Sequence, residues 1–114
     1  MPSESSTKAL NDIAYHIDLA EEFAQGLDRT AFLADLKTVY AVTRCLEIMS
    51  EASRRLSADI KERHDSIDWR AMAAAGNIYR HEYEDVAASR VWSVMITELG
   101  PLRVAIAAEL KAAS

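Results

Sequence analysis

The sequence predicts an all-α fold, an up-down bundle of four to five helices in a single domain. Three Gly and two Pro among 114 residues leave little material for the tight turns of an all-β fold. Ala, Leu, Glu, Arg and Met, which favour helices, are abundant. Half of the residues are hydrophobic and 27% are charged, a balance typical of one globular core. We therefore expect one helical domain over residues 1–114, with residues 1–6 as a flexible N-terminus.

The first half of the chain contains start and stop signals for two long helices with a short turn between them. Ser6 is expected to cap the first helix, which should end near Gly26. Asp28 should cap the short turn, and Asp35 a long helix that reaches about Leu56. Apolar residues recur three and four positions apart and should face the core: Leu10, Ile13, Ile17, Ala20 and Phe23, then Phe32, then Val39, Val42, Leu46 and Met49.

The second half contains signals for a short segment and two further helices. The charged residues 57–64 are expected to form a short helix or loop on the surface. Asp68 should cap a helix that continues to Tyr83, and Asp85 should cap the last helix. Gly100-Pro101 should kink or break that last helix, because proline lacks the amide hydrogen. Its apolar residues are spaced as in a bundle seam: Trp92, Met95, Leu99, Leu102, Ile106 and Leu110.

Charge, hydropathy and cysteine usage exclude several classes of protein. The net charge of −5 argues against a protein that holds nucleic acid by bulk electrostatics. Residues 44–81 carry seven basic and six acidic side chains, so an anion-binding face should draw on this part. No apolar run approaches the roughly 20 residues that span a bilayer, and the start of the chain has no signal-peptide pattern. The single cysteine, Cys45, lies in the apolar register, so we expect a buried inert thiol in a cytoplasmic protein.

The familiar signatures of metal and nucleotide sites do not occur in the sequence. It contains no glycine-rich phosphate loop, no H-E-x-x-H and no C-x-x-C. A di-iron bundle needs Glu three residues before His, whereas Ile13, Lys61 and Ile78 precede the three histidines at that spacing. We therefore expect neither a metal nor a cofactor.

One cluster, Gly76 to Tyr83, combines residue types that suit a phosphodiester. On a continuous helix, Asn77, Arg80, His81 and Glu84 would share a face. Histidine titrates near neutral pH and can move protons, and arginine suits a phosphate. From spacing alone, a solvated helix end is the more common explanation of such a run. Tyrosines such as Tyr79 and Tyr83 are likewise more often packing residues, with their hydroxyl groups in contact with water, than functional groups.

Three stretches of the sequence resemble the HepT family of HEPN domains. Residues 41–52, A-V-T-R-C-L-E-I-M-S-E-A, are similar to the family's A-V-x-R-x-L-E-I-I-G-E-A helix. Residues 67–70, I-D-W-R, resemble its I-P-W-R entry to the catalytic helix. Residues 76–83, G-N-I-Y-R-H-E-Y, occupy the place of its R-N-x-x-x-H-x-Y motif, and Val91-Trp92 matches a final V-W segment. The resemblance covers nearly the whole chain.

The resemblance implies a helical bundle that forms a homodimer, with two motif copies across a cleft. It implies a metal-independent endoribonuclease in which the 2′-hydroxyl of the RNA attacks the adjacent phosphate. His81 would then be the acid–base group, and Asn77 the residue that orients it. The motif arginine does not carry over, because its position is Gly76. Arg80, next to His81, is expected to supply the positive charge instead.

The resemblance also implies a biological partner. Family members are toxins of type VII toxin–antitoxin pairs, encoded beside a minimal nucleotidyltransferase that attaches AMP to the motif tyrosine. Tyr83 would be that AMPylation site, and added phosphate beside His81 would repel RNA. The alternative is a non-catalytic HEPN interaction module that binds a nucleotidyltransferase partner or a nucleotide, with Gly76 marking the loss of activity.

Overall fold

The computed structural model describes the backbone of residues 3–81 and 84–114, and their side chains except those of 78–81 and 84–86. Over these residues the chain forms seven helices and no strand. The helices are α1 (Glu4–Phe23), α2 (Arg29–Ala34), α3 (Leu36–Ser53), α4 (Ala58–Arg63), α5 (Trp69–His81), α6 (Glu84–Thr97) and α7 (Leu99–Ala113).

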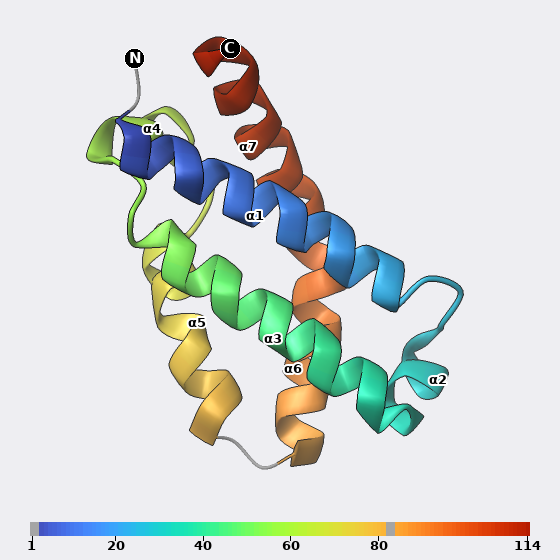
Figure 1. The fold of residues 1–114 in the computed structure, drawn as a ribbon. Helices are drawn as coiled ribbons and strands as arrows, with labels where there is room; N and C mark the ends of the chain where they lie inside the picture. The colour runs from blue at the N-terminus through green and yellow to red at the C-terminus, as the bar shows by residue number, and fades with distance from the viewer. Residues whose placement is uncertain (1–2, 82–83) are drawn as a thin grey trace.

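The five long helices form a bundle, as expected from the sequence, and α2 and α4 are short connecting helices (Figure 1). α1 packs along α3 and also contacts α7. α5 lies against α3, while α6 contacts α2, α3 and α7. The end of α5 and the start of α6 lie at the same end of the molecule as α2 and the start of α3 (Figure 1). The predicted motif therefore lies at this end of the bundle.

The first helix begins earlier than predicted. Ser3 is its N-cap, and the Ser3 hydroxyl oxygen accepts the Ser6 amide at 3.1 Å. Ser6 is buried in the first turn, where its hydroxyl donates to the Arg55 carbonyl at 3.3 Å. The prediction for Ser6 was wrong because either serine can cap locally, and the distant partner that buries Ser6 leaves no local signal. Residues 3–6 therefore belong to the folded domain rather than to a flexible N-terminus. Gly26 has a φ of 80° in the turn that follows this helix.

Three of the four predicted aspartate caps are confirmed. Asp28, Asp35 and Asp68 each accept the backbone amide three residues later, at 2.8, 3.2 and 3.0 Å. The long helix α3 ends at Ser53 rather than at Leu56, although Leu56 is still buried after the helix has ended. Burial continued past the helix end, which is why the apolar pattern alone overestimated its length.

The charged segment from 57 to 64 is not purely a surface element. Ser57 caps α4 by accepting the Ile60 amide at 3.3 Å. Ile60 is only 1% exposed and belongs to the core. A short helix, one of the two possibilities predicted for this segment, is confirmed. One side of this helix is buried in the core.

The predicted final helix is two helices, and the break lies at Glu98 rather than at Gly100-Pro101. α6 and α7 meet there with a bend of 53°. Pro101 is the third residue of α7, where an amide hydrogen would have no partner within the helix, so proline is tolerated. Asp85 also differs from its prediction as an N-cap, because α6 begins one residue before it, at Glu84.

The core contains the apolar residues predicted for the long helices, including Leu10, Ile17, Val42, Met49 and Ile106. Phe32 is fully buried and contacts Trp92, with ring centroids 5.3 Å apart. Cys45 is buried as predicted, and burial raises the pKa of its thiol. Phe23, predicted to face the core, is 41% exposed, because it ends α1.

Among the described residues, no single helix is long and apolar enough to cross a membrane. Within this described part, the pair Ala87–Thr97 and Leu99–Ala113, taken together across its bend of 53°, reaches that length and composition.

Candidate functional site

α5 carries the predicted motif, and several contacts fix its N-terminal half. Asp68 caps it, and the Trp69 indole donates to the His64 carbonyl at 3.0 Å. The Ser50 hydroxyl of α3 donates to the Ala73 carbonyl at 3.1 Å. These bonds join α5 to the preceding loop and to α3, so the first half of the motif helix is held at a defined position.

Gly76 lies where α5 packs against Ser50. The Gly76 amide donates to the Ser50 hydroxyl oxygen at 3.2 Å, and a Cβ added at residue 76 would lie 3.2 Å from the same oxygen. That separation is tighter than nine in ten Cβ contacts. A glycine inside a helix can permit either close packing or a kink, and here the geometry supports packing, because α5 continues unbroken through residue 76 to His81.

The other predicted site residues are only partly within what the structure describes. Asn77 is exposed on α5, one turn before His81. Arg80 and His81 belong to the backbone of α5, but their side chains lie outside the described part, and so does that of Tyr79. Tyr83 lies outside the described residues altogether.

Glu84 does not continue the face of Asn77, as a single long helix would require. α5 ends at His81, and Glu84 is the first residue of α6, which runs back along the bundle (Figure 1). The sequence predicted a boundary here, with one helix ending at Tyr83 and the next capped by Asp85, so the face drawn for one continuous helix does not extend to Glu84.

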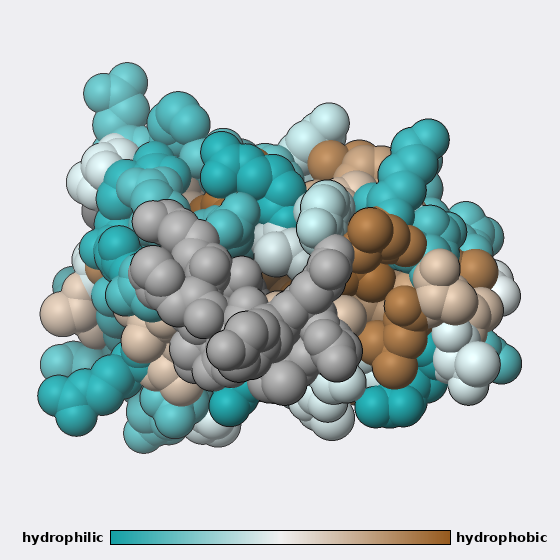
Figure 2. All heavy atoms as spheres, turned by 90° about the horizontal axis from the view of Figure 1, so that it is seen from below, coloured by the Kyte–Doolittle hydropathy of each residue, from teal (hydrophilic) through white to brown (hydrophobic). Residues whose placement is uncertain are grey.

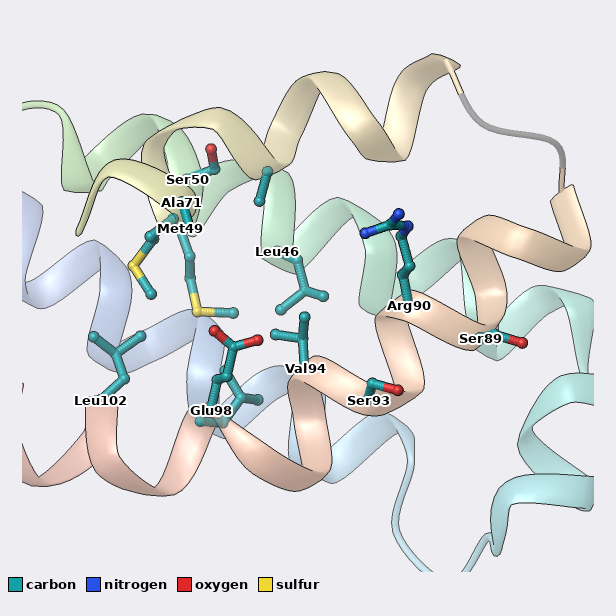
Figure 3. A pocket seen from close by; sticks show the side chains of 13 residues that line it. Leu46, Met49, Ser50, Ala71, Ser89, Arg90, Ser93, Val94, Glu98 and Leu102 are labelled. Carbon is teal, nitrogen blue, oxygen red and sulfur yellow. The ribbon is translucent and has the colours of Figure 1, made fainter. Parts of the chain in front are cut away.

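A groove of about 780 Å³ opens between α5 and α6, with α3 and the start of α7 beneath it (Figure 3). Its lining is mainly apolar: Leu46, Met49, Met72, Val94, Leu99 and Leu102. Arg90 and Glu98 rise from α6 and its end into this space (Figure 3). No local pattern indicated the groove, because it arises from the way α5 and α6 diverge rather than from any one segment.

A second group of charged residues lies between α4 and α7. Glu109, which is 6% exposed, accepts Arg63 Nε and Nη2 at 3.0 and 2.7 Å. His64 Nε2 lies 2.8 Å from Glu109 Oε2. The hydrogen bonds from Arg63, together with that of His64, hold the pKa of Glu109 at about 2. Arg63, predicted to lie on an exposed surface segment, is therefore half of a structural ion pair.

Within the described residues, no group of three or more His, Cys, Asp and Glu side chains is arranged to hold a metal ion. The ion pairs of Glu109 and the side chains that cap helices stabilise the fold, and this role accounts for them. The arrangement that suits chemistry is on α5, where exposed Asn77 precedes Arg80 by three residues and His81 by four, about one helical turn.

The sequence of the chain is similar to that of a known protein family. Residues 13–109 match the family described as HepT-like ribonuclease. The chain is 38% identical over 94 residues to a probable ribonuclease HepT of Thermococcus cleftensis, covering 82% of this chain and 86% of that protein. It is 32% identical over 94 residues to a Methanocaldococcus jannaschii protein named "Putative RNase MJ1380", with the same coverage. No solved structure matches.

Proposed function

Because the chain belongs to the HepT-like ribonuclease family, we propose that it is the toxin of a type VII toxin–antitoxin pair, an endoribonuclease that cleaves RNA in the cytoplasm. The observation that carries the proposal is the continuous α5, which presents exposed Asn77 one turn before His81 on a family-matched segment.

The proposed reaction needs no metal or cofactor. The 2′-hydroxyl of one nucleotide attacks the adjacent phosphorus, so that a 2′-O–P bond forms and the bond to the 5′-oxygen breaks. The proton of the 2′-hydroxyl passes to a histidine acting as base, and a protonated histidine returns one to the 5′-oxygen. His81 acts as this acid–base group, Asn77 orients it, and Arg80 holds the phosphate. The products are a 2′,3′-cyclic phosphate and a 5′-hydroxyl.

The His81→Ala variant tests the reaction. We expect it to reduce cleavage of RNA by at least about a hundredfold, because general acid–base catalysis contributes on the order of 10²–10⁴. Circular dichroism should show an unchanged helical bundle, and EDTA should leave the parent's activity unchanged. Cleavage that survives the substitution, or that EDTA stops, would contradict the assignment.

Arg80→Ala is the companion test of the proposed phosphate contact. We expect a larger loss of cleavage than in Arg44→Ala, which removes an exposed arginine of α3 that lies 3.7 Å from Glu47. Arg63 is unsuitable as the control because it is bonded to buried Glu109. Equal effects of the two substitutions would leave Arg80 without a role in the reaction.

The second candidate function is a non-catalytic module that binds a nucleotidyltransferase or a nucleotide. The observation that favours it is Gly76, which stands where the family motif has arginine and which packs directly against Ser50. Absence of any cleavage by the purified chain, together with stable binding to the neighbouring nucleotidyltransferase, would favour this alternative over the enzyme.

We further propose that the antitoxin is a minimal nucleotidyltransferase that transfers AMP to Tyr83. Support comes from its position in the sequence, two residues after His81, which is the place of the motif tyrosine in the family pattern. Co-expression with the neighbouring nucleotidyltransferase, followed by mass spectrometry, should place the AMP on Tyr83. Adducts on Tyr79 alone would refute this assignment, and the absence of adducts would indicate inhibition by binding.

A further inference from the structure

Arg54 reaches from the end of α3 across to α5. It is the C-terminal capping residue of α3, and its side chain is exposed. Its Nε and Nη2 donate to the Ala73 carbonyl at 3.2 and 2.7 Å. The Ser50 hydroxyl donates to the same carbonyl at 3.1 Å. The guanidinium group is therefore held at a fixed place beside α5.

The guanidinium group of Arg54 retains hydrogen-bond donors that Ala73 does not use. An arginine carries five N–H donors, and Ala73 takes one from Nε and one from Nη2. Three donors remain, on Nη1 and Nη2, which is the edge that binds phosphate oxygens in pairs. Among the described residues Arg54 forms no ion pair, whereas its neighbour Arg55 pairs with Asp12 and Glu51. The charge of Arg54 is thus available to an anion from solution.

Arg54 lies beside the motif helix, but it is too far from His81 to contact the phosphate at which the reaction occurs. Ala73 precedes Asn77 by four residues, about 6 Å along α5, and precedes His81 by eight, about 12 Å. A single phosphate cannot contact groups that far apart. Ala74 and Asn77, which lie between Ala73 and His81 along this helix, are both exposed, so the path from Arg54 towards His81 is open at these positions.

We propose that Arg54 binds a phosphate of the RNA that flanks the cleaved one, an inference that rests on the proposed ribonuclease function. The simple alternative is that Arg54 only joins α3 to α5. The Ala73 carbonyl already accepts the Ser50 hydroxyl, and Ser50 also accepts the Gly76 amide, so the two helices are joined at this point without Arg54. Arg54 is therefore not needed to join the helices, and what it adds is a positive charge at a fixed position.

The Arg54→Gln variant separates the two roles. A glutamine amide can still donate to the Ala73 carbonyl, but it has no charge. RNA binding would be measured in chains that also carry His81→Ala, with a single-stranded RNA oligonucleotide of mixed sequence over a series of salt concentrations. We expect weaker binding at low salt and a slope of log K against log salt that is smaller by about 0.7, the contribution of one phosphate contact on a single strand.

Two matched variants complete the experiment. Arg54→Lys retains the charge and should retain most of the slope, while Arg44→Gln removes an exposed charge elsewhere on α3 and should leave it unchanged. An unchanged slope in Arg54→Gln, with binding by the parent chain, would overturn the inference alone. No RNA binding by the parent chain would overturn the proposed function, and the inference with it.

Discussion

Gly76 brings the backbone of α5 against the Ser50 hydroxyl, so residue 76 cannot carry a side chain unless a neighbour moves. The family pattern has arginine at this position and glycine at the position of Ser50. In this chain the larger residue is on α3 and the glycine is on α5. The exchange gives a packing reason for the missing arginine, which the motif alone could not provide.

We expect Gly76→Ala to destabilise the domain by about 1 kcal/mol. Alanine gains up to about 1 kcal/mol of helix propensity over glycine. The new Cβ would displace Ser50, which loses two hydrogen bonds worth about 0.5–1.5 kcal/mol each. Gly76→Arg should destabilise more, because its whole side chain must leave the contact between the helices. Urea unfolding would measure both variants.

The Ser50→Ala background is the control for this prediction. With the hydroxyl removed, the nearest remaining Ser50 atom is Cβ, 3.6 Å from the added Cβ, an ordinary contact. Gly76→Ala should then be neutral or stabilising. The same destabilisation in both backgrounds would show that Ser50 is not the obstacle.

At the scale of single helices, local signals predicted three of the five helix starts correctly. The side-chain caps at Asp28, Asp35 and Asp68 depend on residues three positions apart, so the sequence contains all that determines them. The break at Glu98 was misplaced because Pro101 fits the first turn of α7 as well as it would fit a kink. The boundary between α5 and α6 contains no proline or glycine, but the predicted cap at Asp85 placed it within a few residues.

Contacts between distant helices were beyond the reach of local patterns. Glu109 and His64 are 45 residues apart, and neither residue's neighbours indicate the pair. For the same reason the partner of Ser50 on α5 could not be read from either segment. The candidate residues Asn77, Arg80 and His81 could be proposed only because they are neighbours on one helix and because the segment resembles a known motif.

The ion pairs of Glu109 predict how the stability of the domain depends on pH. Hydrogen bonds from Arg63 and His64 lower the pKa of Glu109 from its ordinary 4.5 to about 2. The pKa is lower in the folded state, so this stabilisation is complete above about pH 4.5 and is lost as the pH falls towards 2. We expect Glu109→Gln to cost about 1–3 kcal/mol at neutral pH, since a buried bonded group loses its charge-assisted partners.

Urea unfolding at pH 7 and at pH 3 would measure this effect. The difference in stability between parent and Glu109→Gln should shrink at the lower pH, because the parent then loses the same contribution. Glu62→Gln, which alters an exposed carboxylate of α4, should change stability little at either pH. An equal difference between parent and Glu109→Gln at both pH values would contradict the assignment.

At the scale of the whole molecule, a chain with a net charge of −5 must concentrate its basic groups to hold RNA. One motif copy offers a single histidine for both proton transfers. Two copies facing each other would supply a second histidine and double the local positive charge. The end of the bundle where α5 ends also exposes apolar surface (Figure 2). Leu36 and Tyr40, on successive turns of α3, are 50% and 59% exposed.

We therefore predict a homodimer in which Asn77, Arg80 and His81 line a cleft between protomers. Light scattering at micromolar concentration should give twice the 12.7 kDa of the chain. Leu36→Glu should weaken the dimer at least about tenfold, since it places a charge in apolar contact area. Val104→Glu is the control, because Val104 is 71% exposed on α7, outside the end that carries the motif. A strict monomer, or equal weakening of the dimer by both substitutions, would refute this interface. RNA cleavage by a strict monomer would show that one copy of the motif suffices.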